Sequence, residues 1–74
     1  MDRLKILAEK IFETPAAQAK AYEVLQHVAK AKVLPRYAWI THGYVLKKLR
    51  ALGIIVKKGR MWVINEEKVS SLLS

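Results

Sequence analysis

The residues of this chain that are best able to do chemistry are the cations of its second half. No aspartate or glutamate occurs between Glu23 and Glu66, and nine cationic residues occupy that interval. They are Lys30, Lys32, Arg36, Lys47, Lys48, Arg50, Lys57, Lys58 and Arg60. Nine like charges in one small domain repel one another and weaken folding unless a polyanion neutralises them. The pattern therefore predicts a polyanionic partner, and nucleic acid fits best.

Two other interpretations of this charge stay open. The formal net charge of +8 could serve solubility alone, although ordinary surfaces mix both signs. An anionic membrane is a weaker candidate because the cations alternate with apolar positions instead of forming a tail. No run reaches the roughly 20 apolar residues of a membrane span, so we expect no membrane contact. The absence of cysteine fits a reducing compartment, and we expect a cytoplasmic, nucleoid-associated protein.

Catalysis is not expected from this inventory. General acid–base chemistry needs carboxylates or histidines positioned in a cleft, but the acids lie toward the two ends of the chain. The two histidines, His27 and His42, fall in different predicted helices, and neither has a second histidine or a cysteine one turn away. No glycine-rich loop for phosphate occurs. We therefore expect no enzyme activity, no metal, no cofactor and no small-molecule ligand.

The elements that must position the cations form one domain of the α+β class, mostly helical, because 74 residues build a single core. Leu4, Leu7 and Ile11 recur at helical spacing. Thr14-Pro15 is a strong helix start, and Asn65 can cap a closing helix. We expect helices over residues 2–13, 15–31, 35–40, 41–52 and 66–73, and a β-hairpin over residues 54–64.

Residues 32–40 have the least regular pattern. Val33 and Leu34 suit a short strand, and Pro35 can open a short helix that runs through Ile40. Trp39 could fill the core or offer a surface for stacking. Because so small a domain needs the bulk of tryptophan, we expect Trp39 in the core. We also expect Trp62 in the core, with a nucleic-acid contact as the alternative because Trp62 shares a predicted hairpin face with Lys57 and Arg60.

The helix over residues 41–52 is amphipathic. Thr41 can cap it, and Gly53 is the expected left-handed residue that ends it. At 100° per residue, an aliphatic stripe lies on one side, and Lys47 and Arg50 lie opposite with Tyr44 and Lys48 on the flanks. The stripe consists of Val45, Leu46, Leu49 and Leu52.

The hairpin is expected to turn at Lys58-Gly59. This turn places Lys57 opposite Arg60, Val56 opposite Met61, and Ile55 opposite Trp62. Like charges that face each other at the tip lower the stability of the hairpin. A phosphate bound at the tip would offset this repulsion.

The order of these elements resembles the winged-helix (winged helix-turn-helix) family of DNA-binding domains, among them small archaeal and bacterial transcription regulators. The resemblance covers residues 14–64, and one departure is that residues 32–40 leave room for only one or two turns of a second helix. It implies an extra N-terminal helix, a three-helix core, a β-hairpin wing and a short C-terminal helix. The residues that carry it are Leu46, Leu49, Leu52, Gly53, Ile54-Ile55, Lys57-Lys58-Gly59-Arg60 and the opening Thr14-Pro15-Ala16-Ala17-Gln18.

The expected partner is double-stranded DNA, with the helix over residues 41–52 in the major groove. Base contacts are expected from Tyr44, Lys47 and Arg50, and the planar fork of Arg50 suits guanine. For His42, packing inside the domain is an open alternative to a DNA contact. Backbone contacts are expected from Thr41, His42, Lys48, Lys57, Lys58 and Arg60.

Three roles for such a domain stay open. We expect a sequence-specific transcriptional regulator, and apolar faces on the two terminal helices would allow a homodimer. An architectural protein that coats DNA is supported by abundant lysine and by few amide side chains able to recognise adenine. The third role is a module for protein or RNA contact within a larger complex.

Overall fold

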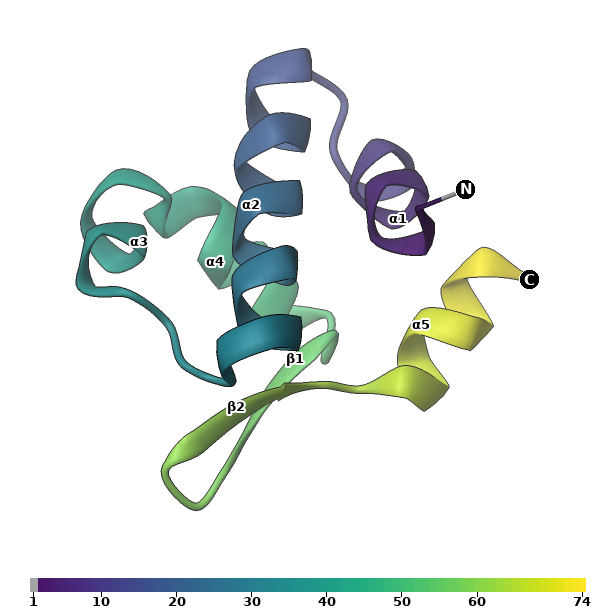
Figure 1. Ribbon diagram of the computed structural model, residues 1–74. Helices are drawn as coiled ribbons and strands as arrows, with labels where there is room; N and C mark the ends of the chain where they lie inside the picture. The colour runs from purple at the N-terminus through teal and green to yellow at the C-terminus, as the bar shows by residue number, and fades with distance from the viewer. Residues whose placement is uncertain (1) are drawn as a thin grey trace.

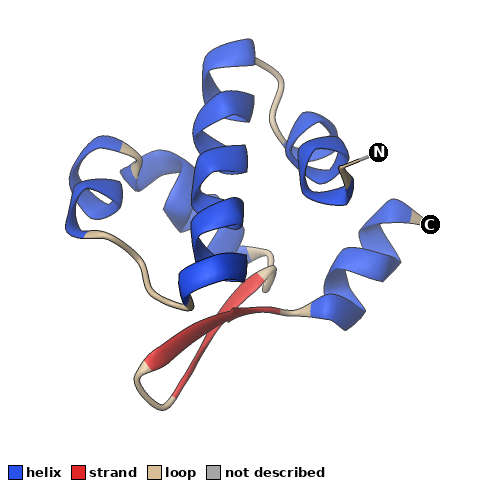
Figure 2. Ribbon diagram, in the orientation of Figure 1, coloured by secondary structure: helices blue, strands red, loops and turns tan. Residues whose placement is uncertain are grey.

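Five helices and one hairpin make up residues 2–74, the part of the chain that the computed structural model describes (Figures 1 and 2). The two strands pair antiparallel. The α+β, mostly helical class predicted from the sequence is confirmed. In chain order the elements are α1 (Arg3–Ile11), α2 (Pro15–Ala31), α3 (Arg36–Thr41), α4 (Gly43–Ala51), β1 (Ile55–Lys58), β2 (Met61–Ile64) and α5 (Glu66–Leu73).

The helices with strong capping residues lie where the sequence predicts them. Thr14 Oγ1 accepts a hydrogen bond from the Ala17 amide at 3.2 Å, and Pro15 occupies the first turn of α2. Asn65 accepts from the Lys68 amide at 3.3 Å at the start of α5. Both helices keep their predicted bounds. The first helix is shorter than the predicted 2–13, because the chain leaves it at Phe12, whose side chain enters the core.

The boundary between α3 and α4 differs from the prediction. Thr41 does not cap a helix over residues 41–52; it is the last residue of α3, and its hydroxyl donates to the Tyr37 carbonyl at 2.8 Å. A threonine hydroxyl that finds an acceptor one turn back is not available for capping. His42 separates the two helices and makes no side-chain cap.

The C-terminus of α4 ends as predicted at Gly53, which has a φ of 75°. The Gly53 amide donates to the Arg50 carbonyl, and the Ile54 amide donates to the Leu49 carbonyl, each at 3.0 Å. This pair of bonds is a Schellman motif, and Leu49 and Ile54, both fully buried, supply its apolar contact. The motif directs the chain from α4 into β1.

The predicted hairpin register is wrong. The turn lies at Gly59-Arg60, so Lys57 pairs with Trp62 and Lys58 pairs with Met61. Gly59 has a φ of 63° and Arg60 a negative one, as in a type II′ turn. A type I′ turn at Lys58-Gly59 would need a left-handed lysine, which costs roughly 1–2 kcal/mol. Because the shift is two residues, each side chain keeps its predicted face of the hairpin.

No strand forms at Val33-Leu34 in the described chain, contrary to the prediction. Lys32 instead adopts a left-handed conformation with a φ of 58° at the end of α2. Its carbonyl accepts a hydrogen bond from the Trp62 amide at 2.8 Å. One backbone bond therefore joins the end of α2 to β2.

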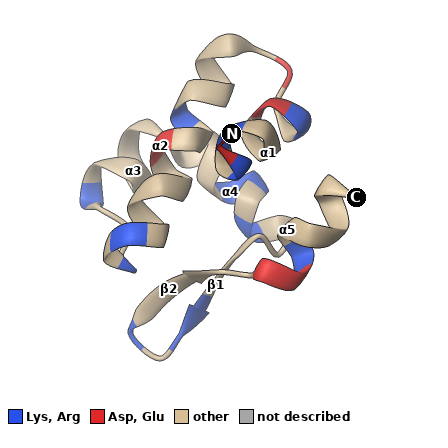
Figure 3. Cartoon of the chain, turned by 45° about the vertical axis from the view of Figure 1, so that its right-hand side comes forward, with Lys and Arg blue, Asp and Glu red and all other residues tan. Residues whose placement is uncertain are grey.

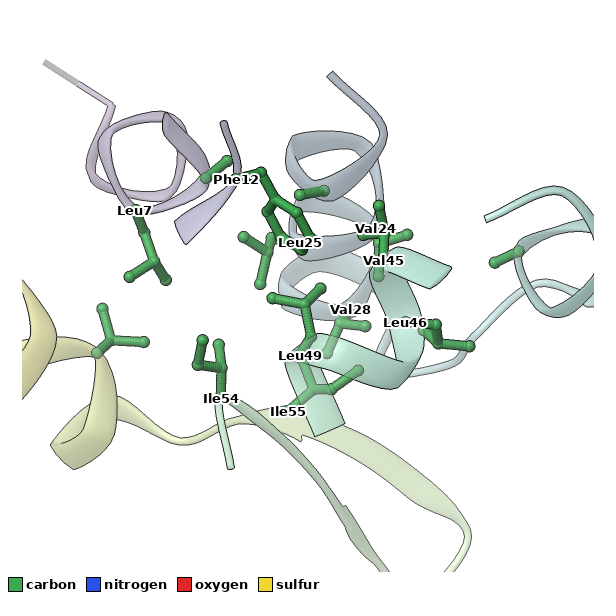
Figure 4. Close-up of a cluster of buried hydrophobic side chains, with 14 residues drawn as sticks. Leu7, Phe12, Val24, Leu25, Val28, Val45, Leu46, Leu49, Ile54 and Ile55 are labelled. Atoms are coloured by element: carbon green, nitrogen blue, oxygen red, sulfur yellow. The ribbon is translucent and has the colours of Figure 1, made fainter. Parts of the chain in front are cut away.

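The core forms where α4 and the hairpin base pack against α2. Figure 4 shows Val45 and Leu49 of α4 directed toward α2, with Ile54 and Ile55 below them. The apolar sides of the terminal helices belong to the same cluster through Leu7 and Val69. Leu72 and Leu73 pack against it, and the homodimer through these helices stays a prediction.

Trp39 is not in the core, contrary to the prediction. A helix of only six residues buries one narrow side, and Ala38 occupies it. Trp39 lies about 100° further around the helix and is 44% exposed. Trp62 is partly buried and packs against the core.

We predict that Gly59→Ala destabilises the protein by about 1 kcal/mol or more, because alanine resists a positive φ. Gly43 provides the matched control. It lies in the first turn of α4, and an added Cβ there meets nothing within 4 Å. Gly43→Ala should leave the free energy of unfolding unchanged or raise it slightly. Urea denaturation of both variants measures the difference, and equal stabilities would contradict the turn.

Candidate nucleic-acid interface

Cations from α4 and from β1 open onto the same shallow hollow. Lys47 and Arg50 of α4, Lys57 of β1 and Trp62 of β2 line a depression of about 430 Å³. Figure 3 shows Lys and Arg segments on both α4 and the hairpin, and no Asp or Glu segment on either. The structure therefore brings three of the predicted contact residues together.

The charges at this hollow are not neutralised within the protein. The ion pairs found among residues 2–74 join Arg3 to Glu66 and Glu23 to His42. Neither pair involves a cation of the hollow. Lys47, Arg50 and Lys57 are all exposed, so an incoming anion would find them solvated and without a carboxylate partner.

Arg50 lies beside two tryptophan rings that contact each other. Its guanidinium carbon is 5.3 Å from the ring centroid of Trp39 and 5.4 Å from that of Trp62. The two rings meet edge to face, with centroids 5.9 Å apart and planes at 62°. Attraction between a guanidinium and a ring face holds the side chain in place. We call Trp39, Arg50, Lys57 and Trp62 the aromatic–cation cluster.

Lys57 joins this cluster because of the observed hairpin register. It is the cross-strand partner of Trp62, and its Nζ lies 5.9 Å from the Trp62 ring centroid. The pairing replaces the repulsion between Lys57 and Arg60 that the predicted register implied.

The other two hairpin cations lie elsewhere. Lys58 follows Lys57 and so points to the opposite face of β1, where it borders a hollow that Glu66 also lines. Arg60 is exposed in the turn. Lys57 thus shares the side of Lys47 and Arg50, whereas Lys58 does not.

Lys48 is engaged inside the protein. Its Nζ donates to the Ile11 carbonyl at 3.0 Å and lies 5.0 Å from the Phe12 ring centroid. It thereby holds the C-terminus of α1, where an ammonium favourably meets the negative end of the helix dipole. The structure does not bring Lys48 to the hollow with Lys47 and Arg50.

Thr41 and His42 are also engaged internally. His42 Nε2 lies 3.0 Å from Glu23 Oε2, its Nδ1 lies 2.9 Å from Thr41 Oγ1, and its side chain is only 10% exposed. Glu23 also accepts a hydrogen bond from the Tyr37 hydroxyl at 2.8 Å. The bond with His42, and then that with Tyr37, lowers the pKa of Glu23. This network ties α2 to α3 and to the start of α4.

Tyr44 lies at the other end of the exposed face of α4. It is 72% exposed, and its ring meets that of Phe12 edge to face at 6.4 Å. It belongs to the outer surface of α4 but not to the aromatic–cation cluster.

Trp39 is the residue that sequence reasoning missed. The signal was present, because a helix of one or two turns cannot bury Ala38, Trp39 and Ile40 together. Trp39 and Ile40 are 44% and 76% exposed. An exposed tryptophan beside arginine therefore follows from the shortness of the second helix.

A larger hollow lies away from these cations. It measures about 520 Å³ and lies between the start of α1 and the second half of α2. Its lining includes Asp2 and Glu23 as well as Lys30. Because both signs of charge meet there, it suits a polyanion less well than the smaller hollow beside Arg50.

Residues 2–74 contain no cluster of three acidic, histidine or cysteine side chains that could hold a metal ion. No helix in the same range is long and apolar enough to cross a membrane. Comparison of the chain with protein-family models, curated proteins and solved structures gave no match.

We predict that the Glu23 network weakens in acid. The pKa of Glu23 is lowered from 4.5, so its contribution to stability is present above that value and is lost as the pH falls through the lowered pKa. Glu23→Gln should flatten the decline in the free energy of unfolding below about pH 4.5. The effect is small because the carboxylate is half-exposed.

Chemical denaturation at several pH values measures this slope. Glu9→Gln is the control, because Glu9 is an exposed acid of α1 with no hydrogen bond or ion pair among the described contacts. If Glu23→Gln and Glu9→Gln have the same pH profile, the network does not contribute as described.

Proposed function

We propose that this protein binds double-stranded DNA as a winged-helix domain, with α4 in the major groove and the hairpin against the backbone. The observation that carries the proposal is the shared hollow, where cations of α4 and β1 face one space without a carboxylate. We propose a binding role and no catalytic step.

The order of the elements supports this proposal. α2, α3 and α4 are followed directly by the hairpin, and the Schellman motif at Gly53 turns the chain from α4 into β1. α4 has nine residues, so it is about 14 Å long. The major groove is about 12 Å wide and admits one helix.

The exposed face of α4 can supply base contacts. Tyr44, Lys47 and Arg50 are exposed on it, while Val45, Leu46 and Leu49 fix the helix from behind. The guanidinium of Arg50 lies near both tryptophan rings and has no carboxylate partner among residues 2–74, so its N–H groups can donate to a guanine edge or a phosphate.

The hairpin can supply backbone contacts. Lys57 lies beside Arg50, and Arg60 is exposed at the tip. Such contacts position a protein on DNA without recognising sequence. Lys58 lies on the other face of the hairpin, so it would reach a phosphate only if the DNA backbone passed around the hairpin turn.

A sequence-specific regulator is the role that the position of Arg50 favours, because a side chain ordered before binding loses less entropy in a specific contact. An architectural coat is the second candidate, favoured by lysines at Lys47 and Lys57 that act as point charges.

We predict that affinity for duplex DNA falls steeply with salt. Each phosphate contact contributes about −0.9 to the slope of log K against log salt concentration. Lys47→Ala and Lys57→Ala should each reduce the magnitude of this slope by about one. Fluorescence anisotropy with labelled duplex over a salt series measures it.

Two lysine variants serve as controls for this series. Lys5→Ala removes the same charge from α1, and Lys48→Ala removes a lysine of α4 that bonds Ile11. Both should keep the wild-type slope. An affinity for duplex DNA that does not depend on salt would refute the proposed function.

We predict that Arg50 carries sequence preference. Selection of bound sequences from a random duplex pool should enrich guanine at one position for the wild type. Arg50→Ala should lose that enrichment, with a cost of about 1–3 kcal/mol on the best site. If the wild type enriches no sequence, the architectural coat replaces the regulator.

A further inference from the structure

The contacts proposed with a DNA duplex do not involve Trp39. Trp39 contacts Trp62 and Arg50 and is still 44% exposed. Bases in a duplex are stacked on one another and present only their edges in the grooves. An exposed indole beside the cations therefore has no stacking partner in a fully paired duplex.

We propose that the aromatic–cation cluster binds an unpaired nucleotide, with its base stacked on Trp39 and its phosphate next to Arg50 and Lys57. The inference rests on the proposed function, because Arg50 and Lys57 belong to the surface proposed to meet DNA. It adds that the preferred DNA contains a nucleotide outside the stack, as at a bulge or a melted step.

The chemistry of the cluster matches the two parts of a nucleotide. Every base has a flat π face that stacks on an aromatic side chain. The guanidinium carbon of Arg50 lies 5.3 and 5.4 Å from the ring centroids of Trp39 and Trp62, and its N–H groups, which meet no carboxylate among residues 2–74, can donate to phosphate oxygens. One site thus offers stacking and charge neutralisation a few ångströms apart.

The surroundings of the cluster favour a nucleotide over a protein segment. Lys47, Arg50 and Lys57 line the adjoining hollow, and no ion pair among residues 2–74 neutralises them. An apolar peptide on Trp39 would cover these cations without supplying a counter-charge, which is costly.

Three DNAs of equal length test this inference. The first is a perfect duplex, the second carries one bulged thymidine, and the third carries a bulged abasic nucleotide at the same position. Stacking of one base predicts that the thymidine bulge binds about five- to a hundredfold more tightly than the perfect duplex. The abasic bulge keeps the extra phosphate and the kink, and it should bind like the perfect duplex.

Single substitutions test whether Trp39 makes the stacking contact. Trp39→Leu should reduce the ratio of bulged to perfect affinity to about one, and Trp39→Tyr should keep most of it because tyrosine also stacks. Ile40→Ala is the matched control, since Ile40 is the next residue of α3, is 76% exposed and lies outside the cluster. It should keep the wild-type ratio.

Intrinsic fluorescence gives a second measurement. The chain has two tryptophans, so Trp39→Phe isolates the signal of Trp62, and Trp62→Phe isolates that of Trp39. The bulged thymidine should quench Trp39 more strongly than the perfect duplex does.

The outcomes separate the two proposals. If the perfect duplex binds with the predicted salt dependence but the bulged thymidine gains nothing over the abasic bulge, this inference fails and the proposed function stands. A gain that survives Trp39→Leu, or that disappears in Tyr44→Leu instead, also overturns it. If no DNA binds at all, the proposed function itself fails.

Discussion

The arrangement of the interface depends on the burial of one aliphatic stripe of α4 against α2. Val45, Leu46 and Leu49 are each at most 2% exposed. Truncating a leucine in such a position costs about 2–5 kcal/mol, a large part of the 5–15 kcal/mol that stabilises a typical domain. Since helical geometry then fixes the opposite side, Lys47 and Arg50 must face outward. The placement of the cations is thus a consequence of core packing and needs no ion pair to hold it.

The aromatic–cation cluster adds a second level of order to this surface. The six acids of this chain are too few to neutralise its 14 lysine and arginine side chains, which leaves a net charge of +8. Two ring faces stabilise Arg50 without neutralising it, since attraction to a π system leaves the formal charge intact. The guanidinium is therefore positioned and still positively charged. An ion pair would also have positioned the guanidinium, but it would have neutralised its charge.

The sequence predicted those elements whose ends are set by local chemistry. Thr14-Pro15 and Asn65 determine where α2 and α5 begin, and Gly53 determines where α4 ends, so these bounds were predictable. Contacts between residues far apart in the sequence were not predictable in this way. The hairpin register depends on which turn residue takes a positive φ, and Lys48 is drawn to α1 by the Ile11 carbonyl. The outward placement of Lys47 and Arg50 follows from helical periodicity, and Trp39 joins them because α3 is too short to bury it.

The bond between the Trp62 amide and the Lys32 carbonyl gives the hairpin a fixed end and a free end. Beyond that point, from Lys58 to Met61, every residue is exposed. The hairpin is therefore attached to the domain at its base, and its tip extends into solvent. In the proposed complex, a rotation at the bonded base would displace Arg60 more than it displaces Trp62 or Arg50, so Arg60 could adjust to the path of the DNA backbone while the other two keep their positions.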